Sequence, residues 1–178
     1  MNYLNTLNQD IIFVQDTHLT EQKITSFNSL WKGKTYHSCF ANNSRGTSVL
    51  ISKNIQHEVI DEFTNANGNY KVVLCKIGTD TYLIGSVYGL NRDEPQFYEK
   101  LEKILEDTEY DHVVLGGDFN FIIDTQADCF GYTNENNVNA KRQFMSICNK
   151  HNLIDVWRKH NPIKEQFTWY TPNLKKRF

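Results

Sequence analysis

The stretch that decides the fold is His112-Val113-Val114-Leu115-Gly116-Gly117-Asp118-Phe119-Asn120. An apolar run that ends in two glycines predicts a buried strand followed by a tight turn. The glycines would let the backbone approach a ligand closely, and Asp118 and Asn120, two residues apart, would then point to the same side. The run therefore predicts a strand end that offers a carboxylate and an amide to one site. A plain strand-to-loop turn uses the same residue types, and the two interpretations carry comparable weight.

Two more apolar runs end in polar residues in the same way. Residues 11–15 lead into Asp16, Thr17 and His18, and residues 85–88 lead through Tyr88 to Asn91. Rigid strands fix the geometry of polar groups at their ends, and Asp16 would suit a hard cation. Asp16 and Thr17 could instead cap the next helix, His18 alone is better read as a surface or core residue, and Tyr88 could be a core aromatic. Three strand ends of one design are more specific than any one of them.

The rest of the chain alternates between strand and helix patterns. Strands are predicted at residues 11–15, 35–40, 47–52, 58–63, 71–77, 82–88 and 112–115. Helices are predicted after a Thr20 cap, with Ile24, Phe27 and Leu30 or Trp31 on one face, from about Glu94 to Asp107, and from about Val138 to Lys150. A cluster of strands, then a helix, then another strand favours an α/β sandwich whose sheets pack face to face under outer helices.

Composition narrows the function classes. The chain has 178 residues, 39% of them hydrophobic, which is enough for one packed domain. No apolar run approaches the roughly 18 residues of a membrane helix and no secretory signal is visible, so we expect an intracellular setting without a membrane. The four cysteines form no Cys-x-x-Cys pair, which argues against a zinc knuckle. The net charge of −2 means that any DNA contact must be local.

Five strings together resemble a known family. They are VQDTH at 14–18, RGTSVLIS at 45–52, SVYGLN at 86–91, LGGDFN at 115–120 and FTWYTP at 167–172. In this order they resemble the endonuclease domains of LINE-type (non-LTR) retrotransposons, within the endonuclease/exonuclease/phosphatase superfamily that includes DNase I. His18 and Phe119 stand where repair enzymes of the superfamily usually have Lys and Leu, which favours the retrotransposon branch. The resemblance covers nearly the whole chain and implies a four-layered α/β sandwich of two packed mixed sheets flanked by helices.

The resemblance also implies roles for individual residues. Asp16 matches the metal-binding acidic residue, which is normally Glu, and the implied metal is Mg²⁺, with Mn²⁺ as an alternative. Asp118 matches the residue that orients or activates the attacking water, and Asn120 matches a stabiliser of the pentavalent state. Tyr88 and Asn91 match contacts to the scissile phosphate. Thr168 and His18 are expected near the DNA.

The chain departs from the family pattern in several places. Relatives carry an upstream strand with an Asn and a downstream Ser-Asp-His segment, so we expect residues 1–178 to be a single domain without its first and its C-terminal strands. Met1 to Asn8 fits a helix end, and loss of the acid/base His predicts little or no nuclease activity for this chain alone. Asp128-Cys129 stands where relatives commonly have Asp-Arg. Lys175-Lys176-Arg177 is the only basic run and could contact backbone phosphates beside Thr168.

The implied function is a DNA-nicking hydrolase that precedes a reverse transcriptase in a nuclear parent protein. Two alternatives stay open at this stage. The same fold could cleave another phosphate ester, because fold does not fix substrate. The chain could also be a catalytically dead remnant that only binds DNA or serves a structural role.

Overall fold

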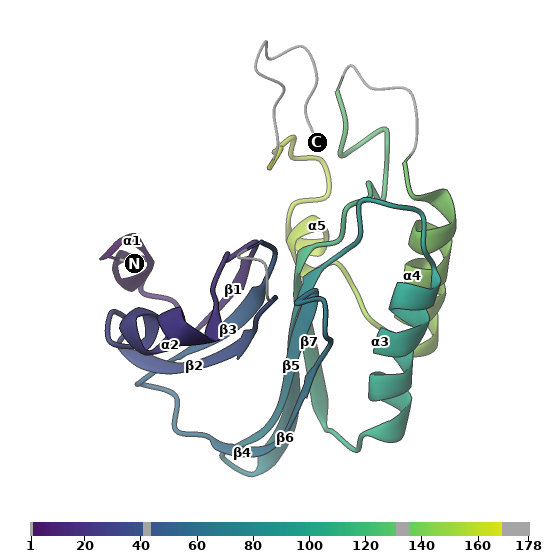
Figure 1. The fold of residues 1–178 in the computed structure, drawn as a ribbon. Helices are drawn as coiled ribbons and strands as arrows, with labels where there is room; N and C mark the ends of the chain where they lie inside the picture. The colour runs from purple at the N-terminus through teal and green to yellow at the C-terminus, as the bar shows by residue number, and fades with distance from the viewer. Residues whose placement is uncertain (1, 41–43, 131–135, 169–178) are drawn as a thin grey trace. The chain divides into compact units, whose positions relative to one another are not determined.

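The computed structural model describes residues 2–40, 44–130 and 136–168, and these form two compact units (Figure 1). The first unit consists of Met1–Gly89 and Asp107–Phe119, and the second of Leu90–Glu106 and Asn120–Phe178. The assignment of residues 1–178 to a single domain stays a prediction.

The first unit contains two β-sheets. One is antiparallel in the order β1-β3-β2, with β1 at Ile11–Gln15, β2 at Gly33–Ser38 and β3 at Thr47–Ser52. The other has the order β4-β5-β6-β7 and consists of Glu58–Thr64, Tyr70–Ile77, Asp80–Tyr88 and His112–Asp118. All seven predicted strands are present. Only the second sheet is mixed, because β7 pairs parallel to β6, whereas the prediction had both sheets mixed.

The two sheets pack face to face through an apolar core. Val49 and Ile51 of β3 meet Val73 and Cys75 of β5 and Ile84 of β6, and all five are fully buried. Burying one such side chain is worth about 1.5–3 kcal/mol. Every second residue of β3 can enter this core because side chains alternate across a strand. The core fixes the position of both sheets, and with them the ends of β1, β6 and β7.

Two short helices accompany the antiparallel sheet, α1 at Asn2–Thr6 and α2 at Glu21–Asn28. For the N-cap of α2, the predicted position is confirmed but the predicted hydrogen bond is absent. Thr20 occupies the N-cap position with extended backbone, but its side chain makes no capping hydrogen bond. Of the two alternatives for the last apolar position, Trp31 is buried, with 8% of its surface exposed, and Leu30 is 51% exposed. The Trp31 indole N–H donates to the carbonyl oxygen of Ile51 at 3.3 Å, and this hydrogen bond explains why Trp31 is the buried residue of the two.

The second unit is built on α3 at Gln96–Asp107 and α4 at Val138–Lys150, which match the predicted helices. They meet through an aromatic cluster, in which the Tyr98 ring lies 5.4 Å from Phe144 and 5.7 Å from Phe121 between centroids. A third helix, α5 at Val156–His160, was not predicted, because five residues are too few to show a helical period. No helix in the described ranges has the length and hydropathy to span a bilayer.

His37 of β2 joins the antiparallel sheet to α2. Its Nε2 lies 2.9 Å from Asn28 Oδ1, and its Nδ1 lies 2.8 Å from the Ser48 hydroxyl. Since the Asn28 oxygen only accepts, Nε2 is the donor, and the neutral ring can then accept the Ser48 proton at Nδ1. Burial, and to a smaller extent the positive charge of Lys71, lowers the pKa of His37 from 6.5 to about 4.

We predict that His37 makes the fold acid-sensitive. The folded-state pKa lies below the unfolded one, so its stabilising contribution is complete above pH 6.5 and is lost as the pH falls through about 4. The loss is on the order of 1–2 kcal/mol once solvent screening of the partly exposed ring is allowed for. Urea unfolding across this pH range measures it. His37→Gln should flatten the profile and the exposed His160→Gln should not; the same slope in His37→Gln and the wild type would contradict the assignment.

Candidate active site

The end of β7 is positioned by its two glycines. A Cβ on Gly116 would lie 2.4 Å from the ring of Phe13 in β1, and a Cβ on Gly117 would lie 1.9 Å from the carbonyl oxygen of Val87 in β6. Gly117 also has a φ of +148°, which residues with a side chain rarely adopt. We expected these glycines to admit a ligand. Instead, atoms of the neighbouring strands fill the space that a Cβ would need. This close packing brings the end of β7 against β6 in its own sheet and against β1 in the other sheet.

The alternation argument for Asp118 and Asn120 is wrong. β7 ends at Asp118, and Asn120 has a φ of +56°, in the left-handed region. Side chains two residues apart share a side only while the chain remains extended. Asn120 therefore begins a turn, and it belongs to the second unit.

Asp16 follows β1, where the chain runs beside Arg45 and Gly46 of the antiparallel β2–β3 hairpin. The Thr17 N–H donates to the carbonyl of Gly46 at 3.1 Å, and the His18 N–H donates to that of Arg45 at 2.8 Å. Asp16 and His18 both have positive φ, and His18 Nε2 lies 3.2 Å from the Asp16 carboxylate. The segment is thus paired with the hairpin, and the alternative that Asp16 and Thr17 cap the next helix is wrong, because α2 has its N-cap at Thr20. Half of the Asp16 side-chain surface stays exposed.

Tyr88 is held at the end of β6 by Asn69. The Tyr88 N–H donates to the Asn69 carbonyl at 2.7 Å, and the Asn69 side-chain amide donates to the Tyr88 carbonyl at 2.9 Å. Asn69 is 2% exposed, so this pair of bonds is shielded from water. The backbone of Tyr88 is therefore fixed from both sides, and its ring is half-buried.

Asp16, Tyr88 and Asp118 gather at one end of the first unit. Tyr88 is opposite Asp118 in the parallel register, and the next N–H, that of Gly89, donates to the Asp118 carbonyl at 2.7 Å. Burial raises the pKa of the Tyr88 hydroxyl, and the negative charges of Asp16 and Asp118 raise it further, while Arg45 opposes them. Two carboxylates from different sheets therefore act on one phenol. These three predicted site residues therefore lie near one another within the first unit.

Of the remaining predicted residues, His18 lies in the first unit beside Asp16, and Asn91, Asn120 and Thr168 lie in the second unit. Asn91 and Thr168 are exposed and Asn120 is partly exposed. The loops that carry Asn91 and Asn120 are tied together, because the Asn137 side-chain amide donates to Leu90 O at 3.0 Å and to Asn120 O at 2.7 Å. The remainder of the FTWYTP string and the basic run Lys175-Lys176-Arg177 lie outside the described residues.

Arg158 contacts the loop in which the resemblance predicts an Asp-Arg pair and the chain has Asp128-Cys129. Arg158 of α5 forms an ion pair with Asp128, which precedes Cys129. The same guanidinium donates to the carbonyls of Asn161 at 3.1 Å and Lys164 at 3.0 Å. It thereby joins the loop at 124–128 to the segment that leads to Thr168. The sequence analysis missed Arg158, Asn69 and Asn137, because each acts through a long-range contact with no short motif.

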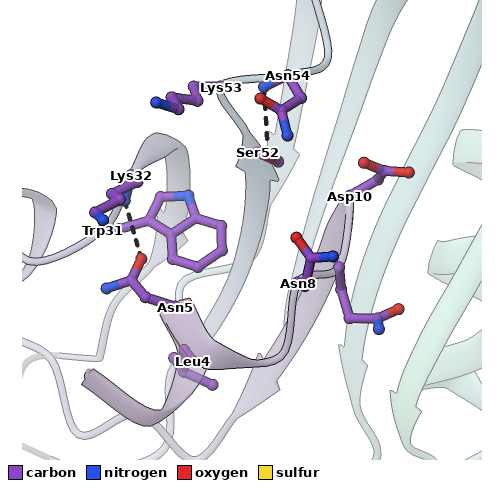
Figure 2. Close-up of a pocket in the computed structure, with 10 residues that line it drawn as sticks. Leu4, Asn5, Asn8, Asp10, Trp31, Lys32, Ser52, Lys53 and Asn54 are labelled. Carbon is purple, nitrogen blue, oxygen red and sulfur yellow. Dashed lines mark hydrogen bonds between the residues drawn. The ribbon is translucent and has the colours of Figure 1, made fainter.

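Two other parts of the molecule, a hollow beside α1 and a cluster of titratable side chains, contain none of the predicted site residues. A hollow beside α1 is lined by Leu4, Asn5, Asn8, Gln9, Asp10, Trp31, Lys32, Ser52, Lys53 and Asn54, none of them a predicted site residue (Figure 2). The polar groups of Asn5 there bond to the backbone, donating to Leu30 O at 2.7 Å and accepting from Lys32 N at 3.2 Å. The side chain of Asn5 thus has a structural role in this hollow.

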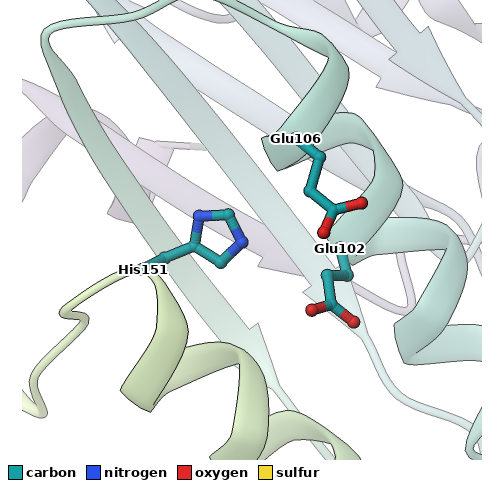
Figure 3. A group of neighbouring side chains, drawn as sticks. All are labelled: Glu102, Glu106 and His151. Carbon is teal, nitrogen blue, oxygen red and sulfur yellow. The ribbon is translucent and has the colours of Figure 1, made fainter.

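The second feature is a group of two residues of α3 and the residue that follows α4, which together could hold a metal ion. The ligand atoms of Glu102, Glu106 and His151 lie within 4.8 Å of one another (Figure 3). The Lys150 ammonium contacts both carboxylates, at 3.1 Å from Glu102 and closer to Glu106. These contacts, led by the hydrogen bond to Glu106, raise the pKa of Lys150. The carboxylates already have a cation, so we interpret the group as an ion-pair network.

The site in the first unit fits a hard divalent cation better. Asp16 and Asp118 offer carboxylate oxygens, which Mg²⁺ and Mn²⁺ prefer, and the half-exposed Asp16 leaves room for the waters that Mg²⁺ keeps. Their combined negative charge is strong enough to raise the pKa of Tyr88. A cation at this point would offset that charge.

Comparison with known proteins agrees with this architecture. The model of the endonuclease/exonuclease/phosphatase family matches residues 1–177. The chain belongs to that family. It is 26% identical over 172 residues to the uncharacterized 149 kDa protein of transposon TX1 from Xenopus laevis, covering 95% of the chain and 13% of that protein.

Two solved structures of the family type share the fold. An AP endonuclease from Archaeoglobus fulgidus aligns with a TM-score of 0.72 at 17% identity, over 98% of this chain and 72% of the other. The endonuclease domain of TRAS1, a telomere-specific non-LTR retrotransposon, aligns with a TM-score of 0.56 at 13% identity, over 84% and 61%. The DNase I-like α/β fold with two sheets and helices is thus confirmed for this family member.

We predict that the pKa of Tyr88 reports on the two carboxylates. Asp16→Asn and Asp118→Asn should each lower it, because each removes a negative charge that disfavours the phenolate, and Arg45→Gln should raise it. Site-resolved NMR titration of the tyrosine ring carbons measures the change. Glu58→Gln is the control, since Glu58 lies at the opposite end of the four-stranded sheet. A Tyr88 pKa that responds equally to Glu58→Gln and Asp118→Asn would contradict the convergence.

Proposed function

We propose that the chain is the DNA-nicking endonuclease part of a retrotransposon protein, in which it precedes a reverse transcriptase. The observation that carries the proposal is the gathering of Asp16, Tyr88 and Asp118 at the strand ends of two packed sheets. Similarity to a transposon protein of which the chain spans 13%, and to the endonuclease domain of TRAS1, supports this class of parent. A nuclear location of the parent and DNA as its substrate follow from the same proposal.

In this proposal each residue has a distinct task. Asp16 holds Mg²⁺, or Mn²⁺ in its place, and the ion when bound supplies positive charge that stabilises the charge developing on the phosphate. Asp118 orients the attacking water and accepts its proton as the new P–O bond forms, while the P–O bond to the leaving sugar oxygen breaks and that oxygen takes a proton from solvent. Tyr88 and Asn91 hold the scissile phosphate, and Asn120 donates to its oxygen in the pentavalent state. His18 and Thr168 contact the DNA beside it.

The chemistry of Tyr88 supports its role as a donor. A tyrosine hydroxyl is protonated at neutral pH and the pKa of Tyr88 is raised further, first by burial, so the hydroxyl can donate a hydrogen bond to a phosphate oxygen. Arg45, which counteracts the two carboxylates, adds a positive charge on the same side of the site. A phosphate diester would thus meet one donor and one cation together with the two acidic groups.

The main alternative is another phosphate ester as substrate, because the family description includes phosphatases. The chain spans 13% of its transposon relative, so the experiment uses the parent protein. Incubation with supercoiled plasmid and Mg²⁺ should give nicked circles, whereas cleavage of simple phosphate monoesters alone would favour the alternative. A protein that cleaves neither would support the interpretation as a catalytically dead remnant.

We predict that Asp118→Ala in the parent protein lowers the nicking rate by about 10²- to 10⁴-fold, the usual effect of losing a proton-accepting group. Rates of conversion of supercoiled to nicked plasmid measure the change. Asp107→Ala removes an exposed carboxylate at the end of α3 and should leave the rate unchanged. Nicking that is equal in Asp118→Ala and the wild type would remove Asp118 from the mechanism.

A further inference from the structure

Asn137 directs its side chain away from the helix that it begins. It occupies the N-cap position of α4 with left-handed backbone, φ 52° and ψ 44°, and its side chain makes no capping bond to that helix. Its amide nitrogen donates instead to Leu90 O and to Asn120 O, at 3.0 and 2.7 Å. With 9% of its surface exposed, Asn137 makes these bonds largely shielded from water.

The residue type fits this arrangement in two respects. Asparagine tolerates a positive φ better than most residues with a side chain. Its NH₂ group carries two protons, so it can serve one carbonyl with each. Aspartate would keep the shape and the backbone preference but could not donate to either carbonyl when ionised. Glycine would keep the backbone conformation alone.

Asp93, in the loop that follows Leu90, also bonds to the start of α4. Its carboxylate accepts from the Asn139 N–H at 3.2 Å, the Asn139 amide at 2.8 Å and the Ala140 N–H at 2.8 Å. These are the N–H groups that a helix start leaves unpaired, and they hold the pKa of Asp93 below its usual value, the Ala140 bond most. The 90–93 loop thus caps α4 while α4, through Asn137, fixes the carbonyl of the same loop.

We infer that Asn137 is a positioning residue of the active site. Its amide sets the separation of Leu90 and Asn120, and therefore of Asn91 and Asn120, the two amides assigned to the phosphate. The inference rests on the proposed function for its catalytic consequence. Its structural content, that one side chain couples the two loops, stands on the hydrogen bonds alone.

The test compares Asn137→Asp and Asn137→Gly with Asn152→Gly, which alters an asparagine of nearly identical φ, +53°, beyond the other end of α4. Amide hydrogen exchange of residues 90–93 and 119–122 is measured in the 178-residue chain, together with its thermal midpoint. Both Asn137 variants should raise exchange in the two loops together by about tenfold or more, because their local opening becomes easier. Asn152→Gly should leave both loops unchanged. Unchanged loop exchange in Asn137→Gly would overturn the coupling.

Kinetics in the parent protein test the catalytic consequence. Both Asn137 variants should lower kcat for plasmid nicking by about 10- to 100-fold, since a misplacement on the order of 1 Å costs this much. KM for DNA should change by less than about threefold, because most DNA contacts are to the backbone and lie elsewhere. An effect on the thermal midpoint with kcat unchanged would show a merely structural role. If the wild-type protein does not nick DNA, the proposed function fails, and the exchange rates alone decide whether Asn137 couples the loops.

Discussion

The contact of Gly116 and Gly117 with the strands beside them is the constraint on which the rest of the first unit depends. β7 can lie against the Phe13 ring of β1 and the Val87 carbonyl of β6 only because neither glycine carries a Cβ. A hydrogen bond also joins β1 to β6, since the Gln15 side chain donates to the Ser86 hydroxyl at 3.0 Å. The ends of β1, β6 and β7 are therefore brought together by packing, before any ligand is considered. Asp16, Tyr88 and Asp118 are the residues at those ends.

Asparagine side chains then fix the loops that leave these strands. Asn69 bonds the backbone of Tyr88 in the first unit, and Asn137 bonds the backbones of Leu90 and Asn120 in the second. A site that must hold a phosphate benefits from such support, because catalytic groups lose efficiency when their backbone can shift. The carboxylates of Asp16 and Asp118, in contrast, remain partly or fully exposed to water.

The sequence was most informative where local pattern and structure coincide. The strands at 11–15 and 47–52 and the helix at 138–150 match the structure to the residue, because alternation and helical period are local properties. The family could be predicted from strings such as LGGDFN, and its fold followed. The packing role of Gly116 could not be predicted, since it depends on contact with Phe13, about a hundred residues earlier in the chain. The roles of Asn69, Asn137 and Arg158 were missed for the same reason: their partners are distant in sequence.

The central claim is the proposal that a divalent cation binds at Asp16, beside Tyr88 and Asp118. Titration with Mn²⁺, whose unpaired electrons broaden nearby NMR signals, tests it most directly. The account predicts that the resonances of Asp16, Tyr88 and Asp118 broaden first, that Mg²⁺ restores them, and that Asp16→Asn weakens the effect. Broadening centred on Glu102, Glu106 and His151, with the signals of Asp16 and Asp118 unaffected, would contradict it.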